Sequence, residues 1–66
     1  PHHIRWKVQR RMRNRWQAVD GLYVDLRSAT MQAERVHRRW PTRAVRICAV
    51  QNERATLTIR YVNAAT

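Results

Sequence analysis

The chain has few acidic residues, and it lacks the cysteines and apolar runs of secreted or membrane proteins. Its 66 residues include four acids, one cysteine and one glycine, and the formal net charge is +10. A lone Cys48 cannot form an internal disulfide, which fits a reducing cytoplasm and excludes a disulfide-stabilised secreted scaffold. No apolar run approaches the roughly 20 residues of a membrane span, and nothing resembles a signal peptide. We therefore expect a cytoplasmic protein.

Residues that carry catalysis or bind metals are also scarce. His37 is the only histidine outside the terminus, where His2 and His3 could take up metal adventitiously. The four acids are scattered, without a pair spaced for acid–base work or a two-metal site: Asp20, Asp25, Glu34 and Glu53. There is no glycine loop to hold phosphate, and one cysteine with one internal histidine makes no zinc site. The sequence predicts no enzyme, no cofactor and no metal site.

Arginine is what the chain has in excess. Thirteen arginines stand against one lysine, and so dense a positive charge attracts polyanions such as nucleic acid, acidic proteins or anionic lipid. The planar guanidinium pairs bidentately with phosphate and carboxylate, whereas an ammonium acts as a point charge. A GC-rich genome raises arginine usage without any functional reason, but it does not explain the scarcity of acids.

Length and composition predict one small folded domain. A hydrophobic content of 44%, with three tryptophans and two tyrosines, argues against a disordered basic tail. We place the domain at residues 4–62. Residues 1–3 are expected to be a disordered terminus or a cloning remnant, and residues 63–66 a frayed tail.

Alternation of apolar and polar residues predicts two strands in the first third of the chain. Residues 4–12 alternate with period two, and a second strand follows from Trp16 to about Val24. Residues 13–15 between them are expected to form a tight turn, because Asn14 tolerates positive φ. The only glycine, Gly21, indicates a bulge or bend within the second strand.

From Leu26 the period changes to that of an amphipathic helix. The apolar stripe is spaced three, four, three and four residues apart and consists of Leu26, Ala29, Ala33, Val36 and Trp40. Asp25 or Ser28 is expected to cap its start, and Pro41 to stop it.

Two further strands, at residues 43–50 and 55–62, complete a ββαββ order. A single helix covers only one face of a four-stranded antiparallel sheet, so the apolar parity of each strand should pack against the helical stripe. The expected class is therefore α+β, with the other face of the sheet open to solvent.

The open face and the first turn carry the predicted binding residues. Strand parity and the turn sequence select Arg5, Lys7, Gln9, Arg11, Arg13, Arg15, Arg46 and Arg60, and parity adds Gln17 on the second strand. A sheet surface of this composition lies well along a phosphate backbone. A secondary basic surface is expected on the outer helix, at Arg27, Arg35, Arg38 and Arg39. As solvated surfaces, an antiparallel sheet face and a helix face can also carry such residues without any function.

The aromatic residues decide the kind of nucleic acid that the sequence favours. Trp6, Trp16 and Trp40 all fall in apolar phase and are expected in the core, while Tyr23 is the best candidate for exposure. Without an outward stacking platform for single strands, the sequence favours backbone-dominated binding of duplex DNA over RNA.

A second function remains open. The chain could be a non-enzymatic adaptor or inhibitor that docks on an acidic protein surface, as phage-encoded host-takeover and anti-defence factors of this size do. A homodimer is compatible with either function, because two sheet edges stay unpaired. Membrane binding is disfavoured, because the core needs the apolar stripe of the helix.

Overall fold

The computed structural model describes residues 4–52 and 54–62, the last seven of them in their backbone only. The elements follow in the order β1 (Arg5–Arg11), β2 (Trp16–Tyr23), α1 (Leu26–Arg39), β3 (Val45–Gln51) and β4 (Arg54–Val62). The predicted ββαββ order and α+β class are confirmed. The expectations for residues 1–3 and 63–66 lie outside the described residues, as do those for the side chains of residues 56–62.

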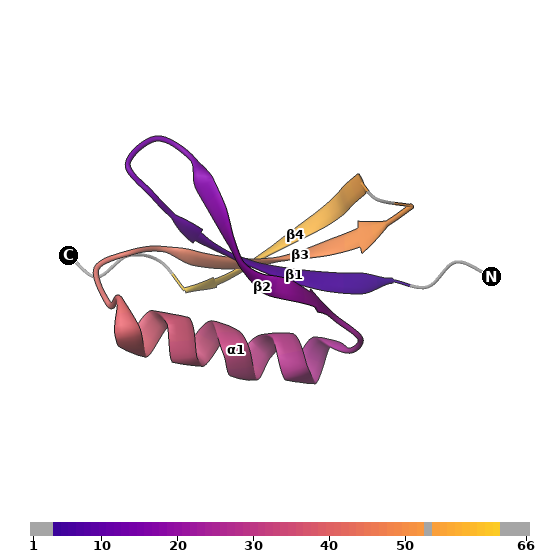
Figure 1. Cartoon of the computed structure of the whole chain (residues 1–66), viewed down its shortest axis with the longest axis horizontal. Coiled ribbons are helices and arrows are strands. Elements are labelled where there is room, and N and C mark those ends of the chain that lie inside the picture. The colour runs from indigo at the N-terminus through magenta and orange to yellow at the C-terminus, as the bar shows by residue number, and fades with distance from the viewer. Residues whose placement is uncertain (1–3, 53, 63–66) are drawn as a thin grey trace.

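All neighbouring strands pair antiparallel in one sheet of order β2-β1-β3-β4. Two hairpins are thus joined through β1 and β3 at the centre, with β2 and β4 at the edges. The helix runs along one face of this twisted sheet, and the tip of the β1–β2 hairpin rises away from it (Figure 1). Among the described residues, no helix is long and apolar enough to cross a membrane.

The core lies between α1 and the two central strands. Its buried residues come from β1, α1 and β3 and are Val8, Ala29, Ala33, Val36, Val45 and Ile47. Partly buried aromatic and aliphatic side chains close its margin: Trp6, Val19, Tyr23 and Trp40. Ala29 and Ala33 are fully buried, so the helix contacts the sheet through its smallest side chains. Leu26, expected in the stripe, is 39% exposed.

Local signals fix both ends of α1. The Asp25 carboxylate accepts a hydrogen bond from the Ser28 backbone N–H at 2.7 Å, so Asp25 is the N-cap. The last turn carries His37, Arg38 and Arg39, and the helix dipole favours positive charge at this end. The helix ends at Arg39, Trp40 is its C-cap, and Pro41 follows.

Strand β2 presents the opposite faces to those predicted. Arg11 pairs with Trp16 across the hairpin, which leaves four residues between the paired positions. A three-residue turn at 13–15 would have paired residue 12 with 16 and turned Trp16 and Ala18 toward the helix. Because side chains alternate, a change of one residue in the loop exchanges the two faces of the strand. Val19 and Tyr23 therefore pack on the core.

The predicted bulge in β2 is confirmed, although its strained residue is not the glycine. Lys7 pairs with Leu22 and Val8 with Val19, so the pairing skips Asp20 and Gly21. Asp20 takes the left-handed conformation, with φ 61°, which aspartate tolerates better than most residues. In the hairpin turns, positive φ occurs at Asn52, with φ 53°, and not at Asn14, where it was expected.

Candidate nucleic-acid interface

The sheet face opposite α1 brings together residues from three strands. Strand register places Arg5, Lys7 and Gln9 of β1 beside Val50, Cys48 and Arg46 of β3, respectively. Contacts between Gln9, Arg46 and Cys48 show that these side chains share one face. Five of the predicted residues thus lie on the open face: Arg5, Lys7, Gln9, Arg11 and Arg46.

Trp16 lies on this open face and contacts two of its arginines. The guanidinium carbon of Arg46 lies 4.1 Å from the centre of the Trp16 ring, and that of Arg11 lies 5.6 Å from it. Gln9 fixes Arg46 from the other side, because its Oε1 accepts a hydrogen bond from Arg46 Nε at 2.7 Å. The expectation that all three tryptophans lie in the core is wrong for Trp16. Parity alone could not identify it, since the hairpin loop decides its face.

Gln17 and Tyr23 are the matching corrections. Gln17, expected on the open face, accepts a hydrogen bond from Arg10 Nη2 at 3.2 Å, and Arg10 stacks over Trp40 at 3.9 Å on the helix side. Tyr23, the aromatic residue that parity marked as the best candidate for exposure, packs against the core. Both follow from the reversed faces of β2.

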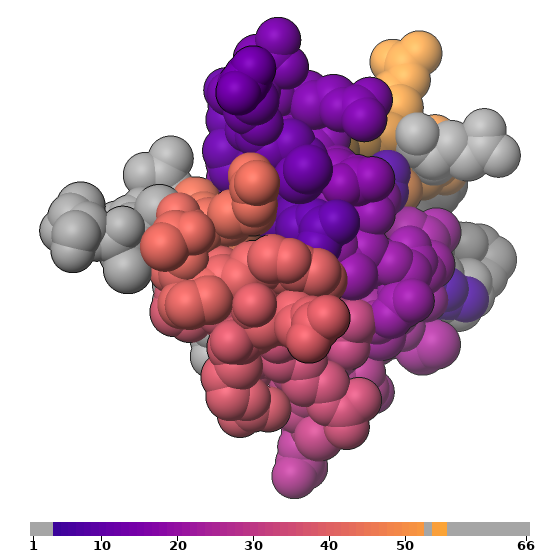
Figure 2. Space-filling view, turned by 60° about the vertical axis from the view of Figure 1, so that its left-hand side comes forward, coloured from indigo at the N-terminus to yellow at the C-terminus, as the bar shows by residue number. Residues whose placement is uncertain are grey.

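One end of the molecule concentrates positive charge. The tip of the β1–β2 hairpin meets the α1–β3 connection there: Arg43 Nη1 donates to the Arg11 carbonyl at 3.1 Å, and the Arg11 N–H to the Ala44 carbonyl at 2.8 Å. Figure 2 looks toward this end, where the indigo hairpin lies above the salmon connection. We call it the basic end. It comprises the arginines of the hairpin tip, of the last turn of α1 and of the α1–β3 connection: Arg11, Arg13, Arg15, Arg38, Arg39 and Arg43.

The basic end joins residues that the sequence had assigned to separate surfaces. Trp40 contacts one arginine from β1 and one from α1. The guanidinium carbon of Arg10 lies 3.9 Å from its ring centre, and that of Arg39 lies 5.7 Å from it. Arg38 and Arg39 thus lie at the same end as the hairpin arginines. Sequence reasoning did not select Arg43, because alternation placed it on the apolar parity of the strand predicted at residues 43–50, whereas β3 begins only at Val45.

Three predicted residues stand apart from this arrangement. Arg27 is in the first turn of α1, at the other end of the helix from the basic end, and Arg35 lines a cleft between α1 and β2. Arg60 is paired with Arg46 through its backbone, and its side chain lies outside the described part.

No ion pair offsets the arginines among the residues whose side chains are described. Asp25 caps the helix, and Asp20 accepts hydrogen bonds from neutral groups. Glu34 and Arg38, four residues apart and expected to pair, make no salt bridge. The positive charge of the open face and the basic end is therefore not neutralised by these acids.

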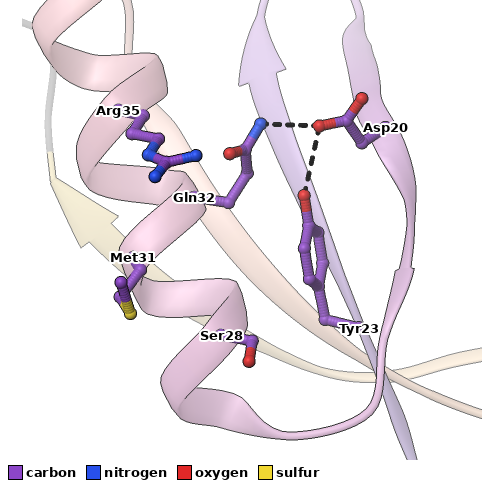
Figure 3. A pocket seen from close by; sticks show the side chains of 6 residues that line it. All are labelled: Asp20, Tyr23, Ser28, Met31, Gln32 and Arg35. Atoms are coloured by element: carbon purple, nitrogen blue, oxygen red, sulfur yellow. Dashed lines mark hydrogen bonds between the residues drawn. The ribbon is translucent and has the colours of Figure 1, made fainter.

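The cleft between β2 and α1 has a different character. It has a volume of about 280 Å³, and its residues are drawn in Figure 3. Asp20 Oδ2 accepts hydrogen bonds from Tyr23 Oη at 3.2 Å and Gln32 Nε2 at 2.8 Å. Burial raises the pKa of Tyr23, and the charge of Asp20 adds to this. These bonds tie the bulge of β2 to the helix, so they have a structural role.

Cys48 lies on the open face as expected, but it is only 1% exposed, and its Sγ donates to Gln9 Oε1 at 3.3 Å. Within the described residues, no three histidine, cysteine or acidic side chains come together to hold a metal ion.

Comparison with protein-family models, curated proteins and solved structures finds no match to this chain. The function must therefore be argued from the geometry alone.

Proposed function

We propose that this protein binds nucleic acid through the open face of its sheet and the adjoining basic end. The observation that carries this is the absence of ion pairs around the arginines in the described part of the chain, at a net charge of +10. A merely solvated basic surface commonly has acids interspersed among its bases. Here Asp20 and Asp25 are engaged in the fold instead.

Phosphate contacts dominate this binding. Arg5, Lys7 and Arg11 follow one face of β1 and form a line of positive charge that can lie along a phosphate backbone, and the hairpin arginines extend the same positive surface. Gln9 uses its carbonyl oxygen to hold Arg46, so it positions an arginine and does not read adenine. Contacts of this kind carry no sequence information. Duplex DNA is the ligand we propose to test first.

Salt dependence tests the proposal. The binding constant for a generic DNA duplex should fall linearly on a log–log plot against salt, with a slope of about −0.9 per phosphate neutralised. Fluorescence anisotropy across a salt series measures this slope. A binding constant that does not change with salt would refute the proposal.

Charge-matched variants locate the surface. Replacing Arg5 and Arg11 by glutamine removes two charges from the open face and should reduce the slope by about two. Replacing Arg27 and Arg35 by glutamine removes the same charge from the helix and should leave the slope nearly unchanged. An equal reduction in both would show that only net charge matters.

A second candidate function rests on exposed apolar side chains. Leu22, Val24, Leu26 and Met31 are 39–71% exposed. Val24 and Leu26 lie where β2 passes into α1, Leu22 lies on the open face beside Lys7, and Met31 lies further along the helix. An adaptor or inhibitor that docks on an acidic protein surface would use such exposed apolar side chains beside its arginines. Pull-down from lysate after nuclease treatment, beside a gel shift with duplex DNA, separates the two functions. A partner lost on nuclease treatment favours nucleic acid. A partner that survives nuclease and is lost on Val24→Asp favours the adaptor.

A further inference from the structure

We infer that Trp16 and Arg46 form a stacking site for an unpaired nucleobase, so that single-stranded DNA gains a contact that duplex DNA cannot make. This inference rests on the proposed function and assigns one part of the same face a narrower role. It depends on where Trp16 lies, on what holds Arg46, and on which nucleic-acid form offers a free base.

Trp16 is an aromatic side chain within a basic, polar surface. It is only partly buried, and it lies on β2, an edge strand, where no further strand covers it among those described. It is also the first residue of that strand, directly after the arginines of the hairpin tip. A nucleic-acid chain held by those arginines would bring its bases to the indole.

Arg46 is pre-organised beside the ring. Its guanidinium carbon lies 4.1 Å from the ring centre, and its Nε donates to Gln9 Oε1 at 2.7 Å. Because the Trp16 ring and the Gln9 side chain hold it on two sides, the guanidinium of Arg46 presents a flat cation stacked with the indole. Bases stack on aromatic rings and on guanidinium planes alike, so a base can extend this stack on either component.

An unpaired base is the ligand group that fits the site formed by Trp16 and Arg46. Within a duplex the faces of the bases are covered by their neighbours, so an indole on a sheet surface reaches only phosphates and groove edges. In a single strand the bases are free to leave their neighbours and stack on the protein. Stacking is sequence-tolerant because every base has a π-face, which agrees with a surface otherwise made of phosphate contacts.

Three variants of the intact chain test the site, with oligo(dT) of about ten nucleotides and a generic duplex of the same length as probes. Trp16→Ala should weaken oligo(dT) binding on the order of tenfold and leave duplex binding little changed. Trp16→Phe keeps an aromatic ring and should restore most of the oligo(dT) affinity. Leu22→Ala, on the same face of β2 and 52% exposed, is the matched control and should affect neither probe.

Tryptophan fluorescence gives a second measurement. Oligo(dT) should quench the wild-type emission, and the quenching should disappear in Trp16→Phe although this variant still binds. Trp6 and Trp40 remain in place as internal references.

The outcomes separate the inference from the proposed function. An equal loss for both probes in Trp16→Ala would mean that Trp16 only orients Arg46, and the inference would be wrong. An unchanged affinity for oligo(dT) in that variant would also overturn it. Wild-type protein that binds duplex but not oligo(dT) would refute the inference and leave the proposed function standing, whereas binding to neither probe would refute both.

Discussion

Asp25 shows how a single acidic residue shapes both the fold and the charge of this protein. Its carboxylate accepts the Ser28 N–H at 2.7 Å, and this hydrogen bond, assisted by the nearby Arg27, lowers the pKa of Asp25 below its usual 3.8. Since the ionised carboxylate is the better acceptor, folding favours the charged form. The sequence predicted a cap at Asp25 or Ser28, because capping chemistry is local. Only the structure decided between them.

Asp25→Ala should lower the melting temperature by a few degrees near neutral pH, because an N–H at the start of α1 loses its acceptor. A pKa lowered by folding contributes stability above pH 3.8, and this is lost as pH falls through the folded value. The melting temperatures of wild type and Asp25→Ala should therefore converge in acid.

Asp25→Asn is the control, because an amide oxygen still caps the helix but does not titrate. A difference between wild type and Asp25→Ala that persists unchanged well below pH 3 would contradict the assignment of this pKa shift to the cap.

At the scale of elements, contact between helix and sheet depends on two small residues. Ala29 and Ala33 are fully buried against Val8 and Ile47, so the space beneath the helix is already filled. The heptad-like stripe in the sequence predicted which helix residues face the sheet. The faces of β1 and β3 were also predicted correctly, because Val8, Val45 and Ile47 lie on one parity and the charged residues Lys7 and Arg46 on the other.

Ala33→Leu should destabilise the protein by about 1–3 kcal/mol, because the added methyl groups have no space between α1 and the sheet. Glu34→Leu, one residue further along the exposed side of the same helix, adds the same side chain and should change stability by less than about 0.5 kcal/mol. Urea denaturation of both variants measures the difference. Equal effects would show that helix composition, and not packing, is responsible.

At the scale of the whole molecule, the basic end and the exposed apolar side chains at the start of α1 lie at opposite ends of the helix. The basic end lies where the hairpin tip meets the α1–β3 connection, whereas Val24 and Leu26 are exposed at the start of the helix. Periodicity could assign arginines to faces of single elements. It could not show that Arg38 and Arg39 would meet the hairpin, because that depends on the direction of α1 across the sheet.

The uncompensated charge should make folding stability depend on salt. Raising ionic strength from about 0.01 M to about 0.15 M shortens the screening length from roughly 30 to 8 Å. The resulting loss of repulsion among the arginines should raise the melting temperature. A variant with Arg13 and Arg15 changed to glutamine should show a smaller rise. A melting temperature that falls with salt would indicate attractive charge pairs beyond the described part of the chain, in which none offsets the arginines.

The sequence by itself determined the order of elements, the apolar stripe of α1, the faces of β1 and β3, and the excess of arginine over acid. The charge excess is a count over the whole chain, and the other features are local, since each depends on neighbouring residues along one strand or one turn of helix. Tertiary structure alone decided the face of β2, the position of Trp16 and the meeting of two arginine groups at the basic end. The physical reason is pairing register: a loop longer by one residue than expected between Arg11 and Trp16 reverses every side chain of the following strand. Two arginines of the open face thus contact Trp16, a side chain that alternation had assigned to the core.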